Sequence, residues 1–403
     1  MLSWKTDRRI LLGVSGGISA YKVTDLVRHW RHAGCDVEIL FTEAAERFVS
    51  PLVLSTFTGR RVWREEDYLD PEKGFSIPHI SLADWAEAMV VAPCTAHVLG
   101  LAARGDSGTL LGAALLATRA PVTLFPAMNV HMWEHPATQE AGEACRRWGY
   151  GVVDPEEGDL ACGYEGKGRL PRTEVLAEWT WRSLSPKRDL QGKRVLVTAG
   201  PTREYLDPVR FLSNPSTGRM GVEIARTAWY RGAEVTVVCG PGVDRSLPGV
   251  TWLPVESAQD MHAACMDLAD RDVIVKAAAV GDYRAETPNP QKVKRRGRTG
   301  WTLELVANRD IAADLGARKR PGQMLVGFAA ETQDLAAHAR EKLAAKGLDL
   351  IAANDVSAPG VGFGSEENEV RLFAPEGELG VLAGSKEEVA DRLWDHIALR
   401  AGS

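Results

Sequence analysis

One pattern of residues occurs twice, about 185 residues apart, and it constrains the fold more than any other feature of the sequence. Residues 9–14 form a short apolar run that ends in a glycine turn, and a helical pattern and a second apolar run at 35–41 follow. The second copy begins at 194–200 and continues with a helical stretch at 221–231 and an apolar run at 233–238. A strand, a glycine turn, a helix and another buried strand predict a βαβ unit with parallel strands. The sequence therefore predicts an α/β protein with two doubly wound, Rossmann- or flavodoxin-like domains and mostly parallel sheets.

A polar segment separates the two copies of this pattern. Residues 183–192 include Pro186, carry several charges and follow neither a helical nor a strand period. Such a composition is typical of a linker between domains. We therefore expect a first domain at 1–182 and a second at 193–403, each long enough to bury its own core.

Further apolar runs predict the remaining parallel strands. They lie at 88–92, 122–125, 272–279, 324–329 and 348–353. In open α/β sheets, ligands bind at the carboxyl ends of the strands. We therefore expect the chemistry in the loops that follow the strands, whose sequences are SGG, PCTA, PAMN, AGP, AVGD, AAET and AND.

The composition excludes several classes of protein. A hydrophobic content of 45% and a charged content of 25% are ordinary for a soluble globular protein. The net charge of −6 argues against a dedicated nucleic-acid binder, and no apolar run reaches the roughly 18 residues of a membrane span. The N-terminus lacks the layout of a signal peptide, and the six cysteines form no CxxC pair. These features predict a cytoplasmic protein without a disulfide framework or a zinc site.

The stretch GDLACGYEGKGRLP, residues 158–171, holds one thiol, Cys162, among four glycines. Glycine at this density predicts neither helix nor strand but a mobile flap. A cysteine on such a loop, with Lys167 and Arg169 close behind it, is placed for proton or electron chemistry rather than for packing.

The first strand–helix turn holds a candidate phosphate site. Gly16, Gly17, Ile18 and Ser19 stand where backbone N–H groups at a helix N-terminus approach a phosphate, and Thr42, after the next strand, adds a hydroxyl. The turn lacks the GxGxxG form of a dinucleotide fold, which favours a mononucleotide. A plain tight turn explains the glycines equally well.

Two further polar residues of the first half begin or follow loops. His79 follows a proline loop and begins a helical run, so it is either an acid–base group or an ordinary residue of a helix N-terminus. Asn129 follows a strand directly, and a carboxylate or amide ligand is the better explanation for it there.

The second half gathers charge near its strand ends. Asp282 lies on the turn after a strand, where it is either a nucleotide contact or a helix-cap residue. The basic run 292–298 begins with Lys292 and suits a triphosphate, although such a run is usually only solvated. Lys342 and Lys346 are four apart, hence on one helix face, and ordinary surface charge is their alternative explanation.

The motifs of both halves resemble known families. In the first half they are SGGISAYK (15–22), TEAAERFVSP (42–51), HISLADWA (79–86), PAMNVHMW (126–133) and GDLACGYEGKGR (158–169). These resemble the flavin-dependent cysteine decarboxylases, in particular the phosphopantothenoylcysteine decarboxylases. In the second half they are VLVTAGPTREYLDPVRFLSNPSTGRMG (195–221), AAAVGDYR (277–284), VGFAAET (326–332), LIAANDVS (350–357) and GFGSEENEV (362–370). These resemble the phosphopantothenate–cysteine ligases, and the order of the halves is that of the bifunctional coenzyme A biosynthesis family.

For the first domain, the resemblance implies an FMN-dependent decarboxylase that forms trimers. In that family, FMN oxidises the cysteine side chain of the substrate to a thioaldehyde, the adjacent carboxylate leaves as CO2, and the electrons are then returned. The catalytic residues that match are His79 for thiol oxidation, Asn129 for the substrate carboxylate and Cys162 as the proton donor. The FMN contacts that match are Gly16, Gly17, Ile18, Ser19, Thr42, Thr95, Ala127 and Met128.

For the second domain, the resemblance implies a dimeric ligase that uses CTP and Mg2+. It activates 4′-phosphopantothenate as an acyl-cytidylate, and the amine of cysteine then displaces CMP. Asn214 matches the asparagine that handles this intermediate, and Lys292 matches the lysine that stabilises the attacked phosphate. The CTP contacts that match are Ala279, Asp282, Lys292, Asn308, Asp310, Ile311, Phe328, Lys342 and Lys346. The resemblance identifies no metal ligands.

The chain departs from these families at a few positions. PCTAH, with Cys94, stands for the usual PATAN, DSGTL (106–110) for an acidic stretch, Arg309 for a proline and Arg219 for a lysine. Cys94 is either a packing residue or a redox group. The first two departures lie where FMN contacts are expected.

Three other functions fit parts of the sequence. A flavin-binding regulatory subunit is disfavoured because His79, Asn129 and Cys162 are all present, and a peptidyl-cysteine decarboxylase because the ligase half is present. A nicotinamide oxidoreductase is disfavoured by the missing GxGxxG motif. The expected partners are small molecules and other copies of the chain, with neither nucleic acid nor a membrane. The size of the oligomer, transfer of intermediates between sites and, apart from the resemblance, the choice of CTP are not determined by the sequence.

Overall fold

The computed structural model of the chain describes residues 2–69, 77–161, 163–295, 299–331, 334–355, 365 and 367–401. The chain divides into two compact units, Leu2–Pro186 and Lys187–Ser403. The division falls inside the segment 183–192. Part of the segment 183–192 is helical or buried, because helix α8 (Thr173–Leu184) extends into it and Leu190 is buried.

The N-terminal unit is built on a parallel sheet. Its strands, in the described part of the chain, are β1 (Arg9–Val14), β2 (Asp36–Phe41), β3 (Val62–Trp63), β4 (Ala88–Cys94), β5 (Val122–Pro126) and β6 (Gly151–Val152). Their order is β3-β2-β1-β4-β5-β6, and every pair is parallel. Every residue of β4 is buried, as expected for a strand with both faces covered. The four strands predicted in this half are therefore confirmed.

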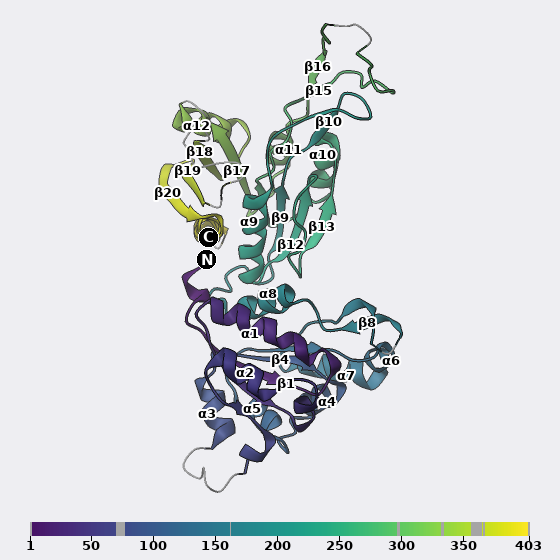
Figure 1. The fold of residues 1–403 in the computed structure, drawn as a ribbon. Helices are drawn as coiled ribbons and strands as arrows, with labels where there is room; N and C mark the ends of the chain where they lie inside the picture. Colours follow the sequence, from purple (N-terminus) through teal and green to yellow (C-terminus); the bar gives the residue numbers. More distant parts are fainter. Residues whose placement is uncertain are drawn as a thin grey trace. The chain divides into compact units, whose positions relative to one another are not determined.

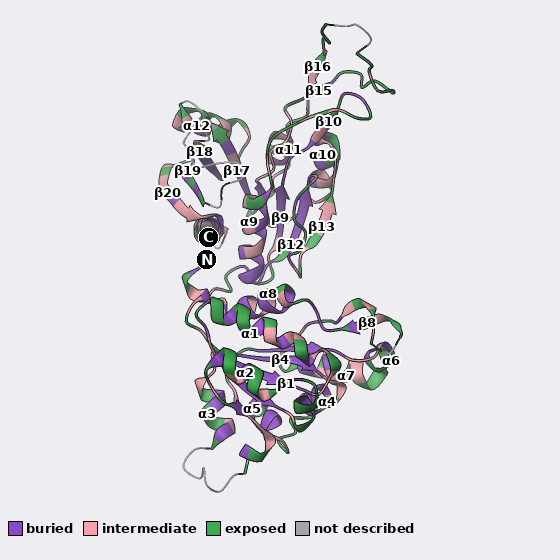
Figure 2. Ribbon diagram, in the orientation of Figure 1, coloured by how far each residue is buried: buried purple, intermediate pink, exposed green. Residues whose placement is uncertain are grey.

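Helices flank this sheet (Figure 1). They are α1 (Val23–His32), α2 (Pro51–Thr58), α3 (Pro78–Trp85), α4 (Ala96–Arg104), α5 (Leu110–Ala117), α6 (Val130–Glu134), α7 (Pro136–Arg147) and α8, with short 3-10 turns η1 (Ser3–Lys5), η2 (Ile18–Lys22), η3 (Glu43–Arg47) and η4 (Glu65–Asp67). Leu11 and Val91 on the strands pack with Leu111 of α5 in one buried cluster. Figure 2 shows the buried residues concentrated in the central strands.

The prediction that the glycine-rich stretch contains no strand is wrong. Strands β7 (Glu156–Asp159) and β8 (Glu165–Arg169) form an antiparallel hairpin. Two of its glycines let the hairpin lie close to residues 128–130. A Cβ at Gly168 would overlap the carbonyl oxygen of Met128, and one at Gly166 would lie 2.8 Å from Val130. The backbone N–H of Met128 also donates to the carbonyl of Gly168 at 3.0 Å. Backbone pairing and contact therefore hold this segment despite its glycine content.

The C-terminal unit is built on a larger, mixed sheet. Its strands within the described ranges are β9 (Arg194–Ala199), β12 (Glu234–Cys239), β13 (Thr251–Pro254), β14 (Val273–Lys276), β17 (Met324–Glu331), β18 (Leu350–Asp355), β19 (Glu367–Ala374) and β20 (Gly377–Ser385). The order is β13-β12-β9-β14-β17-β18-β19-β20. The strands up to β18 pair in parallel, and β19 and β20 add an antiparallel edge that the sequence reasoning did not predict.

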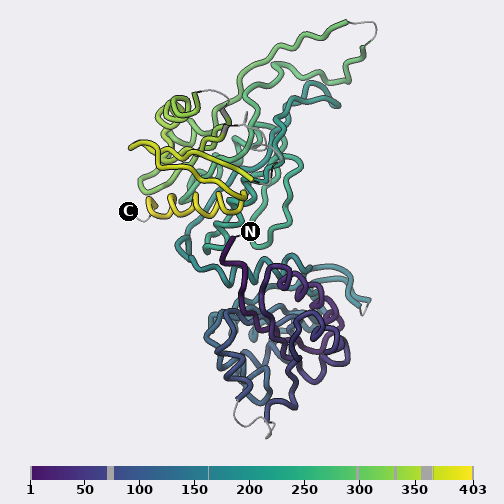
Figure 3. The backbone as a smooth tube through the Cα atoms, turned by 60° about the vertical axis from the view of Figure 1, so that its left-hand side comes forward, coloured from purple at the N-terminus to yellow at the C-terminus, as the bar shows by residue number. Residues whose placement is uncertain are grey.

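Five helices of the described chain accompany this sheet. They are α9 (Arg219–Tyr230), α10 (Ala258–Asp267), α11 (Ile311–Ala317), α12 (Leu335–Ala345) and α13 (Lys386–Ala401). Two small hairpins pair β10 (Arg203–Tyr205) with β11 (Phe211–Ser213) and β15 (Tyr283–Ala285) with β16 (Leu305–Ala307). Figures 1 and 3 both show the β15–β16 hairpin as an arm that projects from the body of its unit. None of the described helices is long and apolar enough to cross a membrane.

A buried arginine ties the start of the C-terminal unit to its last helix. Arg231, only 1% exposed, pairs with Asp189 at 3.1 Å and with Asp391 at 2.8 Å and Asp395 at 2.5 Å on α13. It also donates to the main-chain carbonyl of Asp391. These acceptors satisfy the hydrogen-bonding capacity of a guanidinium that is itself buried at the junction of α9, α13 and residue 189.

We predict that Arg231→Met destabilises the C-terminal unit by about 1.5 to 3 kcal/mol, because the variant loses the charged hydrogen bonds of a buried guanidinium to Asp391 and to the partly exposed Asp189 and Asp395. Hydrogen exchange of the amides in α9 and α13 of the intact protein measures the loss. Arg371→Met is the control, since Arg371 pairs with Glu378 in a half-exposed position and should cost about 1 kcal/mol or less. Equal effects of the two variants would contradict the role of Arg231.

Candidate active sites

A cavity of about 490 Å³ opens in the N-terminal unit where β1, β4 and β5 end. It lies at the carboxyl edge of a parallel sheet, where ligands of such folds bind. Its walls include Gly16, Gly17, Ile18, Ser19, Thr95, Ala127, Met128 and Asn129. The structure thus brings together the predicted FMN contacts except Thr42, and adds Asn129 from the catalytic set.

Ser15 joins two of the loops around this cavity. Its hydroxyl donates to the carbonyl of Pro93 at 2.7 Å and accepts the N–H of Thr95 at 3.0 Å. Ser15 is 1% exposed, so these bonds are shielded from water. The SGG turn after β1 and the PCTA loop after β4 are therefore held as one rigid wall.

The β7–β8 hairpin forms another wall, and it brings positive charge. Leu160, Gly168 and Arg169 line the cavity together with Lys22 of η2. Burial and the neighbouring Arg169 guanidinium lower the pKa of Lys22. These two cations outnumber the one carboxylate of the described lining, Asp159, and so favour an anionic group in the cavity.

Asn129 stands at the start of α6, in the cavity wall. Its Oδ1 accepts the N–H of His131 at 2.9 Å and so caps the helix. This bond fixes the orientation of the amide, which lies beside Met128 in the lining. A fixed amide can donate to a carboxylate.

Thr42 and His79 do not line the cavity of a single copy of the chain. In the described part of the chain, Thr42 Oγ1 and His79 Nδ1 are buried without a hydrogen-bond partner. The His79 ring instead meets Tyr68 edge to face at 5.4 Å. Cys162 lies outside the described residues, but its neighbour Ala161 lines the cavity.

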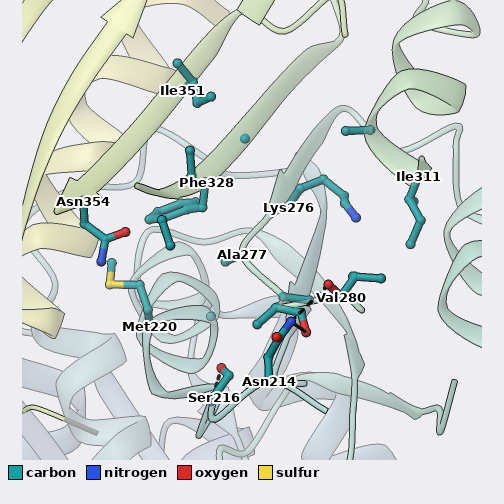
Figure 4. Close-up of a pocket in the computed structure, with 18 of the residues that line it drawn as sticks. Asn214, Ser216, Met220, Lys276, Ala277, Val280, Ile311, Phe328, Ile351 and Asn354 are labelled. Carbon is teal, nitrogen blue, oxygen red and sulfur yellow. Dashed lines mark hydrogen bonds between the residues drawn. The ribbon is translucent and has the colours of Figure 1, made fainter. Parts of the chain in front are cut away.

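A second cavity, of about 540 Å³, opens in the C-terminal unit beyond the end of β14 and along residues 327–330 of β17 (Figure 4). The predicted residues in its walls are Asn214, Ala279, Asp282, Asn308, Asp310, Ile311, Phe328, Lys342 and Lys346. Lys292 is the predicted residue missing from this lining. It is exposed on the segment between β15 and β16, where the N–H of Val293 donates to Asp207 at 3.2 Å.

Two asparagines hold the turn after β14. Asn214 Nδ2 donates to the carbonyls of Ala279 at 3.2 Å and Val280 at 3.1 Å, bonds that Figure 4 shows as dashed lines. Asn308 Nδ2 donates to the carbonyl of Gly281 at 2.8 Å. The turn sequence AVGD is thus fixed by side chains from loops distant in the sequence.

Positive charge dominates the second cavity. Six basic side chains and two carboxylates stand in its described lining, and one carboxylate, Asp310, is paired with Lys346 at 2.9 Å. Burial alone would raise the pKa of Asp310, but this pair and the N–H groups of Ala312 and Ala313 lower it. The remaining excess of cations favours an anionic ligand. Nowhere in the described ranges do three His, Cys, Asp or Glu side chains gather as metal ligands would.

Sequence reasoning missed several residues of this cavity. Lys276, Asn354, Asn368 and Lys386 also line it. Asn368 is 6% exposed, and its Oδ1 has no hydrogen-bond partner among the described residues, so the wall holds an unused acceptor. Asn354 could have been predicted from the sequence, because it belongs to the AND loop after a predicted strand. Lys276 could have been predicted as well, because it is a lysine that interrupts an apolar run.

Comparison with known proteins finds two family models that match the chain, one over each unit. The Flavoprotein family model matches residues 3–185, and the model of the DNA/pantothenate metabolism flavoprotein C-terminal domain matches residues 190–400. The chain is 43% identical to the coenzyme A biosynthesis bifunctional protein CoaBC of Bacillus subtilis, over 97% of each chain. It is 41% identical to the protein of the same name from Escherichia coli, over 98% of this chain and 97% of the other. A crystal structure of the C-terminal domain of a CoaBC protein is 39% identical and covers 53% of this chain and 97% of its own, with a TM-score of 0.45.

The cysteines of the described chain allow a test of the structure. Cys35, Cys94, Cys145, Cys239 and Cys265 are buried and free of disulfides, and burial raises the pKa of each thiol, that of Cys145 to about 11. This supports packing as the role of Cys94. At about pH 8 we expect these five thiols to resist a thiol-specific reagent, because little thiolate is present. Any rapidly labelled thiol of the native protein is then Cys162, and Cys162→Ser should abolish the labelling. Rapid labelling of that variant would contradict the structure.

Proposed function

Because this chain belongs to the family of bifunctional coenzyme A biosynthesis proteins, we propose that its two cavities are the two active sites of that family. The chain is a bifunctional enzyme. Its C-terminal part joins 4′-phosphopantothenate to cysteine, and its N-terminal part decarboxylates the product to 4′-phosphopantetheine. The assignment rests on one observation: in each unit, loops distant in the sequence bring most of the expected site residues around a single cavity.

The cavity of the N-terminal unit is proposed to hold FMN. The rigid wall made by Ser15, the glycine turn after β1 and the cations Lys22 and Arg169 suit an aromatic ligand with a phosphate. The buried, unpaired hydroxyl of Thr42 is a further candidate contact. FMN supplies a reversible two-electron oxidant for the cysteine side chain of the substrate.

The residues of the chain bind the substrate and move its protons. Asn129, capped in place on α6, donates from its amide to the substrate carboxylate before CO2 leaves. The β7–β8 hairpin forms one wall of the cavity, and Cys162, between its strands in the sequence, supplies the proton when the enethiol left after loss of CO2 is reduced to the product. The ring of His79, partly exposed at the start of α3, is proposed to accept the thiol proton in the cavity of a neighbouring copy of the chain.

The cavity of the C-terminal unit is proposed to bind CTP with Mg2+ and to form the acyl-cytidylate. Lys342 and Lys346 face the triphosphate, and the turn 279–282 holds the nucleotide by its backbone. Mg2+ is proposed to enter with the nucleotide, since phosphate oxygens and few carboxylates are its usual partners at such sites. Lys292 lies exposed on the arm between β15 and β16, outside the lining of this cavity. It is proposed to reach the attacked phosphate of a bound nucleotide from that position.

We further propose that the protein is a cytoplasmic homo-oligomer, with trimers of the first unit and dimers of the second. Large apolar side chains are exposed on both units. They include Leu52, Val53 and Phe57 on α2, and Val209, Phe211 and Tyr283 near the projecting arm. Such surfaces suit contacts between copies. Five free cysteines fit a reducing compartment.

One experiment tests the two-site assignment. The full chain, given 4′-phosphopantothenate, cysteine, CTP and Mg2+, should release pyrophosphate and CO2 in equal amounts, and the purified protein should show a flavin spectrum. Pyrophosphate release without CO2 from flavin-loaded protein would favour the regulatory subunit instead. Release with ATP and not with CTP would contradict the nucleotide assignment.

We predict that Gly168→Ala lowers the FMN content of the purified protein at least about fivefold, because the new Cβ pushes β8 away from Met128 and opens the cavity wall. The ratio of flavin to protein absorbance measures this. Gly100→Ala is the control, since its Cβ on α4 meets only the end of the Arg104 side chain, at 3.4 Å. Full FMN occupancy in Gly168→Ala would show that the β7–β8 hairpin is not part of the flavin site.

We predict that Asn214→Asp slows amide formation by at least about 100-fold and pyrophosphate release far less. A carboxylate cannot donate to the carbonyls of Ala279 and Val280, so the variant loses the amide that faces the intermediate. Asn308 still holds the turn at Gly281, and the nucleotide contacts on Lys342 and Lys346 remain. Separate assays of pyrophosphate and amide measure the two steps. Equal loss of both steps would assign Asn214 to nucleotide binding.

A further inference from the structure

A buried lysine in the cavity of the C-terminal unit has no assigned role. Lys276 is the last residue of β14, between Thr198 of β9 and Gly327 of β17. Because strand residues alternate between faces, Lys276 shares its face with Ile274, which packs in the core with Cys265 and Ile311. Its ammonium group reaches the cavity along this apolar face, and Figure 4 shows its nitrogen between Phe328 and Ile311.

The burial of this charge is not compensated by the protein. Lys276 is 9% exposed, and no described residue forms a hydrogen bond or an ion pair with its Nζ. The carboxylate near it, Asp310, is already engaged by Lys346 at 2.9 Å and by two N–H groups of α11. A buried ammonium without an anion is costly, so this position is stable as a charge only when a ligand supplies the anion.

The surroundings of Lys276 identify the kind of ligand. Lys342 and Lys346 line the same cavity, and Lys346 is close enough to disfavour charge on Lys276. Six basic side chains in this lining against two carboxylates, one of them paired with Lys346, match a polyanion better than a single carboxylate or a neutral group. The nucleotide of the proposed function carries such a polyanion in its phosphate chain.

We propose that Lys276 is a substrate-contacting residue of the ligase site, which donates hydrogen bonds to the phosphate chain of the nucleotide together with Lys342 and Lys346. This inference rests on the proposed function. It adds a residue that neither the motifs nor the family resemblance singled out.

The protonation of Lys276 gives the proposal a distinct signature. The groups that act on it are Cys265 on α10, Asp310 before α11 and Lys346 after α12, and burial lowers the pKa of Lys276 most. Phosphate oxygens raise that pKa again. The pKa of Lys276 is therefore lower in the free protein than in the protein with bound nucleotide. At a pH between these two values the protein takes up a proton when the nucleotide binds, so the affinity for the nucleotide falls as pH rises through this range.

The test compares Lys276→Met with the wild-type full chain. A hydrogen bond between charged groups is worth about 1.5 to 3 kcal/mol, so CTP should bind about 10- to 100-fold more weakly to the variant. The loss should be small for cytidine, which lacks phosphate, and grow through CMP to CTP. Calorimetry in buffers of different ionisation enthalpy should show proton uptake in the wild type and less in the variant.

The controls separate this role from a structural one. Lys319→Met removes a lysine that pairs with Asp349 at 2.8 Å and does not line the cavity, so CTP affinity should not change. Lys276→Gln replaces Lys276→Met if the latter does not fold. Unchanged CTP affinity and proton uptake in the Lys276 variant, or equal losses for cytidine and CTP, would overturn the role of Lys276. A wild-type protein that binds no cytidine nucleotide contradicts the proposed function instead.

Discussion

Parallel pairing of the central strands is the constraint on which both sites depend. In parallel sheets all strands end at the same edge, so the loops after β1, β4 and β5 meet in one unit. In the other unit the loop after β14 lies beside the carboxyl-terminal half of β17. Neither site needs a contiguous sequence. Hydrogen bonds then lock the loops together: Ser15 joins the turn after β1 to Pro93 and Thr95, and Asn214 and Asn308 hold residues 279–281.

The two cavities differ in how their walls are made. In the N-terminal unit the wall depends on close backbone approach, because β8 passes over Met128 and only glycine fits at position 168. In the C-terminal unit the wall is defined by charge, because basic side chains outnumber carboxylates and one carboxylate, Asp310, is already paired with Lys346. The first arrangement suits a flat, tightly packed ligand with one anionic end, and the second suits a polyanion.

Much of the fold followed from local patterns. The apolar runs at 9–14, 194–200 and 324–329 became β1, β9 and β17, because a strand buried on both faces must be apolar throughout. The hairpin β7–β8 did not follow, since its pairing depends on contacts with Met128 and Val130 that no local propensity records. The antiparallel β19 and β20 were missed as well, although the burial of β19 largely alternates as a half-covered strand does.

The sequence by itself determined the two α/β halves, the edges where ligands bind and, through its motifs, the family. Most of the residues that those motifs singled out lie around one of the two cavities. Only the tertiary structure decided which of those residues meet. It placed Asn214 against the turn after β14, left His79 and Lys292 outside the cavities of a single copy, and buried Lys276 in a cavity that Lys342 and Lys346 also line. The physical reason is that backbone patterning depends on neighbours in the chain, whereas the partner of a charge or a polar atom depends on which distant segments the packed sheet brings beside it.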